Sequence, residues 1–516
     1  MRRVKAPSNG RLSRVRTPDK VELRQIPTGI AGLDDIIGGG LPEFSFNIIA
    51  GALGSGKTTM AHQIVFANAT PRQPALYFTV LGEPALKMLR YQQQFSFFDP
   101  AKLNKSIRFI NLSQVVLEKN LNKVLQAIER EVGASNPSIV MVDSFRNIAP
   151  GHLGAEGEIE MPGFIQRLAV LLTSWQATTF LIGEYSEEDI RDNPVFTVAD
   201  GLFWLTQNVE RNSVVRKLQV LKLRGQDSIP GLHTIRITRD GIQAFSRTRG
   251  LPGRKVSPGT RRRLSIGIPE LDEMMGGGIL EGDSVLISGP SGTGKSALAT
   301  HFLAEGLRHG EAGVAAVFEE RPEGYVARAA SLNLDLTKPQ GRGKLEILYL
   351  RPLDLSVDES LQAILGAVKR TNAKRLAIDS LVGFEMALSP GFREDFRESL
   401  YRMIVALTDA GVTIITTVEV VDSFDSMSFS QYAISFLTDD IIRLRYVEID
   451  GQLRKIIVVI KMRGGNHSKD IREYVINEKG VVIIGSRMTD YARLTTGLPE
   501  RIGSINKAAP EPKATA

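Results

Sequence analysis

Two glycine-rich segments carry the residue types and spacing of a phosphate-binding loop. Residues 51–58 and 289–296 both fit the pattern GxxxxGK[ST], and each follows an apolar run and precedes an amphipathic one. In such a loop the backbone N–H groups turn toward phosphate oxygens, and the N-terminus of the following helix adds partial positive charge. The sequence therefore predicts two ATP sites, formed by Gly51, Gly54, Ser55, Gly56, Lys57, Thr58 and Thr59 and by Gly289, Gly292, Thr293, Gly294, Lys295, Ser296 and Ala297.

Each loop also supplies a cation and a metal-binding hydroxyl. Lys57 and Lys295 are expected to reach the β- and γ-phosphates, and Lys295 therefore counts among the catalytic residues of the second half. Further along, the runs SIVMVD and RLAID end in carboxylates, and a carboxylate there holds Mg²⁺ directly or through water. The sequence thus predicts Mg-ATP in both halves, with Thr58, Asp143, Ser296 and Asp379 around the metals.

Hydrolysis also needs a group that orients or deprotonates the attacking water. Glu319 and Glu320 follow the apolar run after the second loop, where P-loop ATPases of one large class place this group. Glu320 is the expected activating residue, with Glu319 beside it. In register, the first half has Leu81 and Gly82, and Glu83 lies one residue further on. We therefore expect the first site to bind ATP and to hydrolyse it slowly unless Glu83 swings in.

A basic pair recurs late in each half, far in sequence from its own loop. The first pair is Lys222 and Arg224, and the second is Lys461 and Arg463. Basic side chains on a late strand can act in trans on the γ-phosphate held by a neighbouring subunit, which contributes about 10³–10⁵ in rate. One such pair would be read as surface charge. Its recurrence favours the trans role and a ring with ATP between subunits.

These residues are positioned by a duplicated domain. The two loops lie 238 residues apart, the two aspartates 236 and the two basic pairs 239. Pro252, Gly253, Pro258 and Gly259 interrupt regular structure between the halves. The expected parts are a basic disordered tail (1–20), a first domain (21–246), a linker (247–263), a second domain (264–490) and a C-terminal segment with a disordered tail (491–516).

Within each half, short apolar runs alternate with amphipathic segments. Such alternation predicts an α/β fold whose mostly parallel sheet is covered by helices on both faces. Additional antiparallel strands are expected at 215–223 and 454–461. Parallel strands are expected at 44–50, 75–80, 107–111, 138–142 and 178–182, and at 284–288, 314–318, 345–349, 374–378 and 412–417. Helices are expected in the first half at 57–69, 84–95, 118–132 and 161–176.

Composition restricts the class of protein. The chain has 516 residues, 42% hydrophobic and 23% charged, which is ordinary for globular domains. The absence of cysteine excludes disulfides and cysteine-based metal sites, and it fits a cytoplasmic location. The six histidines show no metal-binding spacing. No apolar run reaches the length of a membrane helix, and the N-terminus lacks the apolar core of a signal peptide, so we expect no membrane association.

The basic charge is concentrated in two segments. Residues 1–20 carry +6 and residues 247–263 carry +7, whereas the whole chain carries +7, so the remaining residues carry −6. A basic tail can contact nucleic acid or acidic lipid. A solvated arm is the favoured interpretation, and DNA binding is left open without being favoured.

The paired GxxxxGK[ST] loops, the LDxxxGGG motif before each loop, the FEE triplet and the K[LM]RG strands resemble the KaiC family, from about residue 22 to 503. The resemblance implies tandem RecA-like ATPase domains that form a double-ringed homohexamer with ATP at subunit interfaces. It also implies serine/threonine autokinase activity and membership of a circadian or other signalling system. Residues 446–476 are especially similar to the family pattern.

The sequence departs from that pattern in three places. Ser435 matches the family's acceptor serine, but Phe436 replaces the neighbouring acceptor threonine, so only single-site phosphorylation is expected. The first half lacks the glutamate pair, which argues against a 24-hour timing function. The C-terminus ends in KAAPEPKATA after a segment resembling the family's A-loop (492–501), so regulation by KaiA is not expected. A KaiB-like partner remains open.

Two other functions stay open. A nucleic-acid motor of the RecA or DnaB type would share the fold, but it needs a basic channel or aromatic stacking platform that the sequence does not display. A non-catalytic switch, in which nucleotide only orders a scaffold, suits the degenerate first half. The intact second half favours an enzyme.

Overall fold

A computed structural model of the chain provides the geometry of two units, each described by itself below. The basic tail, most of the linker, Glu83 and Ser435 lie outside the described residues. The described residues are 23–80, 85–148, 154–210, 213–247, 261–336, 344–350, 356–383, 393–420, 438–477, 482–494 and 499–502.

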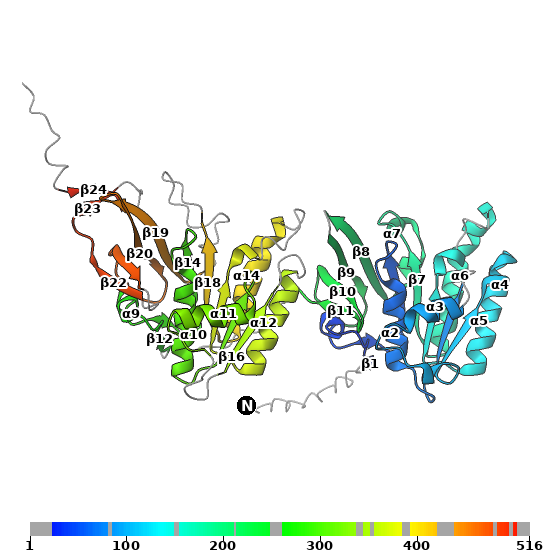
Figure 1. Cartoon of the computed structure of the whole chain (residues 1–516). Helices are drawn as coiled ribbons and strands as arrows, with labels where there is room; N and C mark the ends of the chain where they lie inside the picture. The colour runs from blue at the N-terminus through cyan, green and yellow to red at the C-terminus, as the bar shows by residue number, and fades with distance from the viewer. Residues whose placement is uncertain are drawn as a thin grey trace, which may run out of the picture. The chain divides into compact units, whose positions relative to one another are not determined.

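The first unit is built on a nine-stranded sheet, with strand order β11-β10-β9-β8-β3-β7-β6-β4-β5 (Figure 1). The pairs β3–β7, β7–β6, β6–β4 and β4–β5 are parallel, and β9 and β10 are antiparallel. The strands are β3 (Phe46–Gly51), β4 (Ala75–Thr79), β5 (Ile107–Asn111), β6 (Ile139–Asp143), β7 (Thr178–Glu184), β8 (Gly201–Glu210), β9 (Ser213–Leu223), β10 (Leu232–Thr238) and β11 (Gly241–Phe245).

Helices cover both faces of this sheet. Val124 and Leu168, from α5 and α6, share a buried core with Ile48. On the other face, the ring of His62 in α2 lies 4.6 Å from that of Tyr77 in β4. The helices are α1 (Leu33–Ile36), α2 (Lys57–Asn68), α3 (Ala85–Gln92), α4 (Ser113–Leu117), α5 (Leu121–Ser135), α6 (Gly154–Ser174), α7 (Asp189–Asp192) and α8 (Val195–Val198).

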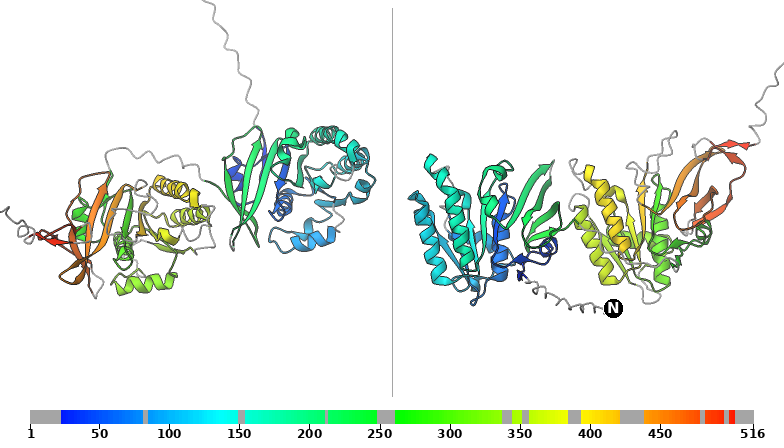
Figure 2. Two further views of the ribbon diagram at one scale, coloured as in Figure 1. Left: turned by 90° about the horizontal axis from the view of Figure 1, so that it is seen from above. Right: turned by 180° about the vertical axis from the view of Figure 1, so that it is seen from behind.

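The second unit repeats this topology, with strand order β16-β15-β17-β18-β14-β19-β20-β21-β22. Figure 2 shows its sheet and helices, coloured from green to red, in two further views. In this order, each pair of neighbours from β16 through β15, β17, β18 and β14 to β19 is parallel. The pairs β19–β20, β20–β21 and β21–β22 are antiparallel. The strands are β14 (Ser284–Gly289), β15 (Gly313–Val317), β16 (Leu345–Tyr349), β17 (Arg375–Asp379), β18 (Thr413–Glu419), β19 (Asp440–Ile449), β20 (Gln452–Met462), β21 (Arg472–Ile476) and β22 (Val482–Arg487).

Two separate apolar cores lie on the two faces of this second sheet. Phe302 of α10 and Tyr325 of α11 belong to one core, and Leu361 of α12 and Leu400 of α14 belong to the other. The helices are α9 (Pro269–Met274), α10 (Lys295–Arg308), α11 (Pro322–Ser331), α12 (Val357–Thr371) and α14 (Arg393–Asp409). The fold class predicted from the sequence, two tandem RecA-like α/β domains, is confirmed.

The LDxxxGGG motif has a structural task in each unit. The carboxylate of Asp34 accepts from the backbone N–H of Thr28, and that of Asp272 accepts in the same way from Ile266. Gly40 and Gly278 have φ values of 151° and 108°, and a Cβ on either would lie within 2.6 Å of a backbone carbonyl oxygen. Only glycine fits there, so the motif fixes the chain that leads into the P-loop strand.

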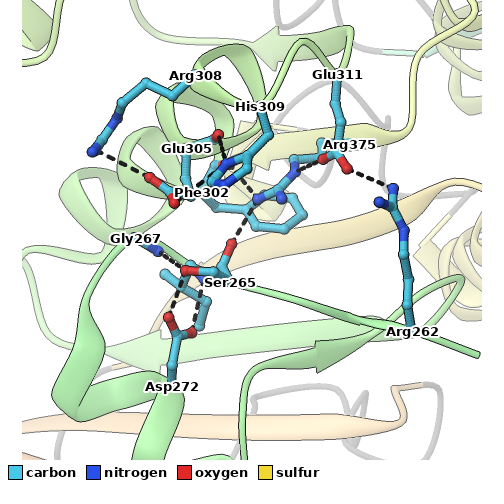
Figure 3. Close-up of polar contacts among 11 residues, drawn as sticks. Arg262, Ser265, Gly267, Asp272, Phe302, Glu305, Arg308, His309, Glu311 and Arg375 are labelled. Atoms are coloured by element: carbon cyan, nitrogen blue, oxygen red, sulfur yellow. Dashed lines mark hydrogen bonds and ion pairs between the residues drawn. The ribbon is translucent and has the colours of Figure 1, made fainter.

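A buried arginine anchors the strand that leads to Asp379. Arg375, the first residue of β17, donates to Glu311 at 2.6 Å and to the carbonyl oxygens of Ser265 (2.7 Å) and Phe302 (2.9 Å). Figure 3 shows this guanidinium between Glu311 and the Phe302 ring, with Arg262 on the second oxygen of Glu311. The network joins the start of β17 to the end of α10 and to the incoming chain.

Most predicted elements match the observed ones within two residues. The predicted strand 178–182 is β7, which continues to Glu184, and the predicted helix 57–69 is α2. Helix α6 begins seven residues before the predicted 161, and the predicted helix 118–132 is α5, shifted to Leu121–Ser135 behind a separate α4. The antiparallel strands expected at 215–223 and 454–461 are β9 and β20, each one member of a larger antiparallel extension.

Smaller pairs complete the described residues. Tyr491–Ala492 (β23) pairs with Glu500–Arg501 (β24), which are the two ends of the segment that resembles an A-loop. Strand β1 (Gln25–Ile26) pairs with β2 (Leu41–Pro42), and β12 (Arg263–Leu264) pairs with β13 (Ile279–Leu280). Over the residues described, none of the helices combines the length and the apolar character that crossing a membrane requires.

Candidate functional site

The two P-loops have the same internal geometry. Gly54 and Gly292 have φ values of 72° and 76°, and Gly56 and Gly294, which cap α2 and α10, have 104° and 97°. L-residues with side chains rarely adopt these angles, so the glycines are required for the loop to turn. The hydroxyls of Ser55 and Thr293 each donate back to a loop carbonyl at 2.7 Å. Thr59 and Ala297 lie in the first turn of the following helix.

The P-loop lysines are held inside their own loops. Lys57 Nζ donates to the carbonyl of Ala52 at 2.6 Å, and Lys295 Nζ donates to that of Pro290 at 2.8 Å. Burial lowers the pKa of both amines, while nearby carboxylates raise it. A buried amine with few fixed partners is a suitable site for a phosphate anion, because the phosphate oxygens replace the lost hydration.

In the first unit, the predicted metal-binding residues Thr58 and Asp143 are in direct contact. Thr58 Oγ1 donates to Asp143 Oδ2 at 2.9 Å, and the hydroxyl of Tyr77 donates to the same oxygen at 2.8 Å. Burial raises the pKa of Asp143, and the two hydrogen bonds and the charge of Lys57 lower it. Sequence reasoning did not identify Tyr77, whose place in the second unit is taken by Ala315.

In the second unit, the corresponding aspartate has different partners. Thr417 Oγ1 donates to Asp379 Oδ1 at 2.6 Å, and Arg328 Nη2 lies 3.7 Å from Asp379 Oδ2. The charge of Asp379 also acts on Lys295, at the base of the P-loop helix that begins with Lys295 and Ser296. The predicted residues of the second metal site therefore share one end of the sheet.

The donor set of each site fits Mg²⁺ together with nucleotide phosphates. Among the described residues, no group of three or more His, Asp or Glu side chains could hold a metal without other ligands. Mg²⁺ prefers few protein oxygens and keeps waters and phosphate oxygens as its other ligands. One hydroxyl and one carboxylate in each unit, beside a P-loop lysine, meet that preference.

The two glutamates of the second site face different partners. Glu319 Oε1 lies 3.5 Å from the hydroxyl of Ser380, the residue after Asp379, and its charge acts on Lys295. Glu320 accepts from Arg328 Nε at 3.0 Å. Glu319 is thus the member of the pair whose charge acts on the P-loop lysine, whereas Glu320 is paired with Arg328. The sequence had favoured Glu320 as the activating residue, and that assignment stays a prediction.

One further carboxylate in each unit was missed by the sequence analysis. Glu184 ends β7 and Glu419 ends β18, each paired in register with the first glycine of its P-loop. Their charges are the largest influences that raise the pKa of Lys57 and Lys295 against burial. The repeat itself carried the signal, because a glutamate lies two residues beyond the predicted end of each of these strands, and both observed strands extend to it.

The basic pairs predicted to act in trans have partners within their own domains. Lys222 donates to the carbonyl of Thr197 at 3.1 Å, and Lys461 donates to that of Thr438 at 2.6 Å. Arg224 and Arg463 form ion pairs at 3.2 and 3.5 Å with aspartates, Asp200 and Asp439, that also hold the start of each P-loop strand. The recurrence of the pair is therefore explained within each domain, and the trans role stays a prediction.

A buried carboxyl group lies beside the second basic pair. Asp440 begins β19 and is fully buried, and burial together with the charges of Asp283 and Asp439 raises its pKa to about 7. The backbone N–H of Arg463 and the charge of Arg263 lower the pKa. The folded chain thus holds this proton more tightly than the unfolded chain does.

This pKa gives a test of pH-dependent stability. A folded-state pKa above the unfolded value means that the contribution of Asp440 to stability is greatest below about pH 4 and decreases until about pH 7. We expect Asp440→Asn to gain about 1–3 kcal/mol over the wild type at pH 8, with a much smaller difference at pH 4. Urea unfolding at both values measures it. Equal pH dependence in the two proteins would contradict the assignment.

Comparison with known proteins agrees with this geometry. A family model described as "ATPase: KaiC" matches residues 26–249 and again residues 264–488. The chain is 29% identical over 502 residues to the circadian clock oscillator protein KaiC of Picosynechococcus sp., covering 94% of both chains. It is 30% identical over 496 residues to KaiC of Rippkaea orientalis, covering 93% of this chain and 92% of the relative.

A third relative is the circadian clock oscillator protein KaiC 1 of Synechocystis sp., which is 29% identical over 498 residues and 94% of each chain. The similarity therefore extends through both units. Each match of the family model includes one P-loop and the aspartate expected to bind Mg²⁺, which is Asp143 or Asp379 and is called the Walker-type aspartate below. The chain belongs to the KaiC family of ATPases, with two copies of the family's ATP-binding domain.

Proposed function

We propose that the chain hydrolyses ATP mainly at its second site and uses the same site to phosphorylate Ser435, in a homohexameric signalling or timing protein. The observation that carries the proposal is the position of Glu319, whose charge acts on Lys295 and whose side chain lies by the residue after Asp379. A general base must come within hydrogen-bond reach of the proton that it abstracts, and a carboxylate close to the P-loop lysine is suitably placed to reach an oxygen that attacks the γ-phosphate.

The residues of the second site divide the task among them. Bound Mg-ATP supplies an electrophilic γ-phosphorus and a leaving ADP. Lys295 would bind the β- and γ-phosphates, and Ser296 and Asp379 would hold the Mg²⁺ ion that accompanies them. Glu319 takes the proton from the attacking oxygen, which comes from water in hydrolysis and from Ser435 in phosphorylation. The new O–P bond forms as the bond from phosphorus to the β–γ bridging oxygen breaks.

The first site is proposed to bind ATP and to turn it over slowly. Leu81 and Gly82 occupy the positions of the glutamate pair. Lys57, Thr58 and Asp143 retain the groups needed for Mg-ATP, and the contact between Thr58 and Asp143 supports this. A bound but slowly hydrolysed nucleotide would stabilise the first domain, and the gain in the free energy of unfolding would grow with the logarithm of the ratio of nucleotide concentration to Kd.

Oligomer and partners follow from the family and remain proposals here. ATP between subunits of a hexamer would bring Lys222 and Arg224, or Lys461 and Arg463, toward a neighbour's phosphates, at the cost of the contacts that they make within their own domain. A KaiB-like protein is a candidate partner. The relatives named as circadian clock oscillators suggest a timing role without requiring it.

Intact-protein mass spectrometry after incubation with Mg-ATP tests the proposal. We expect one added phosphate on the wild type, none on Lys295→Ala, and none on Ser435→Ala, which keeps its ATPase activity. Phosphate that persists in Ser435→Ala would move the acceptor elsewhere. ATP hydrolysis without any added mass would refute the kinase activity and leave an ATPase, and stimulation by single-stranded DNA would then favour the nucleic-acid motor.

A further inference from the structure

Arg328 joins the glutamate pair of the second site to the metal-binding aspartate. It lies on α11, directly after the segment that carries Glu319 and Glu320. Its Nε donates to Glu320 Oε2 at 3.0 Å, and its Nη2 lies 3.7 Å from Asp379 Oδ2. One guanidinium thus contacts two carboxylates from different parts of the sheet edge: Glu320 follows β15, and Asp379 ends β17.

The guanidinium is held in place by a buried ring. Arg328 lies 4.8 Å above the ring of Tyr325, one turn earlier on α11, and Tyr325 is 1% exposed. The Tyr325 hydroxyl is 3.2 Å from Thr300 Oγ1, which in turn donates to the carbonyl of Ser296 at 2.7 Å. Stacking on a fixed ring reduces the freedom that Arg328 loses when it forms its ion pairs. The chain of contacts runs back to the proposed Mg²⁺ ligand Ser296.

This arrangement separates the roles of the two glutamates. The carboxylate of Glu320 is engaged in its ion pair with Arg328. The carboxylate of Glu319 lies near the hydroxyl of Ser380, and its charge raises the pKa of Lys295. Because the two glutamates are consecutive in the chain, fixing the side chain of one restricts the backbone that orients the other. Arg328 therefore influences the orientation of Glu319 through the backbone, by fixing Glu320.

The described residues of the first unit do not show this arrangement. Arg90 is the counterpart of Arg328 by register, and its side chain is exposed. The neighbouring glutamates are absent, since positions 81 and 82 are Leu and Gly. Asp143 accepts from the neutral hydroxyls of Thr58 and Tyr77. Asp143 thus has two hydroxyl donors, whereas Asp379 has one hydroxyl donor, Thr417, and the guanidinium of Arg328.

We propose that Arg328 is a positioning residue of the second site. It fixes Glu320, and through the backbone it orients Glu319. It also competes with the incoming metal ion for the carboxylate of Asp379. The first part rests on the proposed function, because it requires ATP turnover at the second site. The second part depends only on the competition between a guanidinium and a divalent cation for one carboxylate.

The two parts predict effects of opposite direction. Removing the guanidinium leaves the negative charge of Asp379 without this neighbouring positive charge, so a divalent metal ion should bind there more tightly. Removing the tether leaves Glu319 less well oriented, so turnover should decrease. A residue that only stabilises α11 would weaken both properties together when it is removed.

The test uses Arg328→Met in the full chain, with Arg90→Met as the matched control. Free Mn²⁺ is measured by electron paramagnetic resonance during titration of the chain with Mn²⁺ in the presence of ADP. We expect Arg328→Met to tighten Mn²⁺ binding at one of two sites by about two- to fivefold, as suits a partly exposed ion pair. Steady-state ATPase should lose about tenfold in kcat, with KM changed less than twofold.

Further variants separate positioning from stability. Arg328→Lys keeps the charge but cannot make both contacts, so Mn²⁺ affinity should return to the wild-type value while kcat stays low. Glu320→Gln should lower kcat by about the same factor as Arg328→Met. The double variant should lower kcat by no more than either single variant does. Arg90→Met should match the wild type in both assays, and thermal unfolding checks that each variant is folded.

The outcomes are distinct. Weaker or unchanged Mn²⁺ binding in a folded Arg328→Met chain would overturn the shared use of Asp379. Losses in kcat that add in the double variant would overturn the positioning of Glu319 through Glu320. A wild type without ATP turnover would refute the proposed function, and the Mn²⁺ titration would still decide whether Arg328 competes for Asp379.

Discussion

Replacing Glu319 with glutamine is expected to slow ATP hydrolysis at the second site by about 10²–10⁴-fold, the usual contribution of a general base. The amide cannot accept the proton of the attacking water, although it has nearly the same size as the carboxylate. Phosphate release is measured in a Lys57→Ala background, which removes the contribution of the first site. ATP affinity should change little, because Lys295 and the loop backbone provide the phosphate contacts.

Glu320→Gln is the matched control for this prediction. Glu320 pairs with Arg328 at 3.0 Å, so its loss should act only through orientation, with a decrease of about tenfold. The same ranking should hold for phosphorylation of Ser435, since one base serves both reactions in the proposed mechanism. A larger decrease for Glu320→Gln than for Glu319→Gln would restore the assignment that the sequence alone had favoured.

The sequence could not separate the two glutamates, for a physical reason. Consecutive residues just after a strand point in different directions, and which of them faces the nucleotide depends on the backbone at that turn. Glu319 and Glu320 have the same chemistry and nearly the same position along the chain. Their partners, Ser380 and Arg328, come from a different strand and from the following helix. Such contacts are set by tertiary structure, which hydrophobic periodicity does not contain.

The P-loops and the Walker-type aspartates were more accessible to sequence analysis. Their glycines need positive φ angles that few other residues adopt, so the motif itself specifies the local backbone. Asp143 and Asp379 follow continuous apolar runs, which predicts buried parallel strands ending at one edge of the sheet. The contact between Thr58 and Asp143 agrees with that reasoning. Glu184 and Glu419 required the strand order as well, because β7 and β18 lie beside their P-loop strands only in the folded sheet.

The differences at element boundaries also have local causes. Helix α6 contains Pro162 and begins at Gly154, where glycine and proline give weak helix propensity and hide the true start from the sequence pattern. The antiparallel extension was predicted only in part, because its outer strands alternate between buried and exposed residues. Strand β22, for example, has Val482 and Ile484 buried and Ile483 exposed. Val482, Ile483 and Ile484 form an unbroken apolar run, so the alternation between buried and exposed side chains is set by the sheet and is not visible in the residue types.

Replacing Arg375 with methionine is expected to destabilise the second domain by about 3–5 kcal/mol, the cost of breaking a buried ion pair. The side chain of Arg375 is 3% exposed, and it satisfies Glu311 together with two backbone carbonyl oxygens (Figure 3). Methionine fills the space of the stem but removes the donor from Glu311 Oε2 and from the two carbonyl oxygens, and among the described residues Glu311 then keeps only its pair with Arg262. Urea unfolding, with each domain followed as its own transition, measures the loss.

Arg370→Met is the control, because Arg370 also pairs with a glutamate, Glu346, at 2.5 Å, but its side chain is 62% exposed. An exposed pair contributes about 0–1 kcal/mol, so a loss of similar size in both variants would contradict the role of burial. Arg375 begins the strand that ends in Asp379, so its removal should also loosen the metal-binding carboxylate. Saturating Mg-ADP stabilises only the folded state, and it should therefore recover part of the lost stability in Arg375→Met.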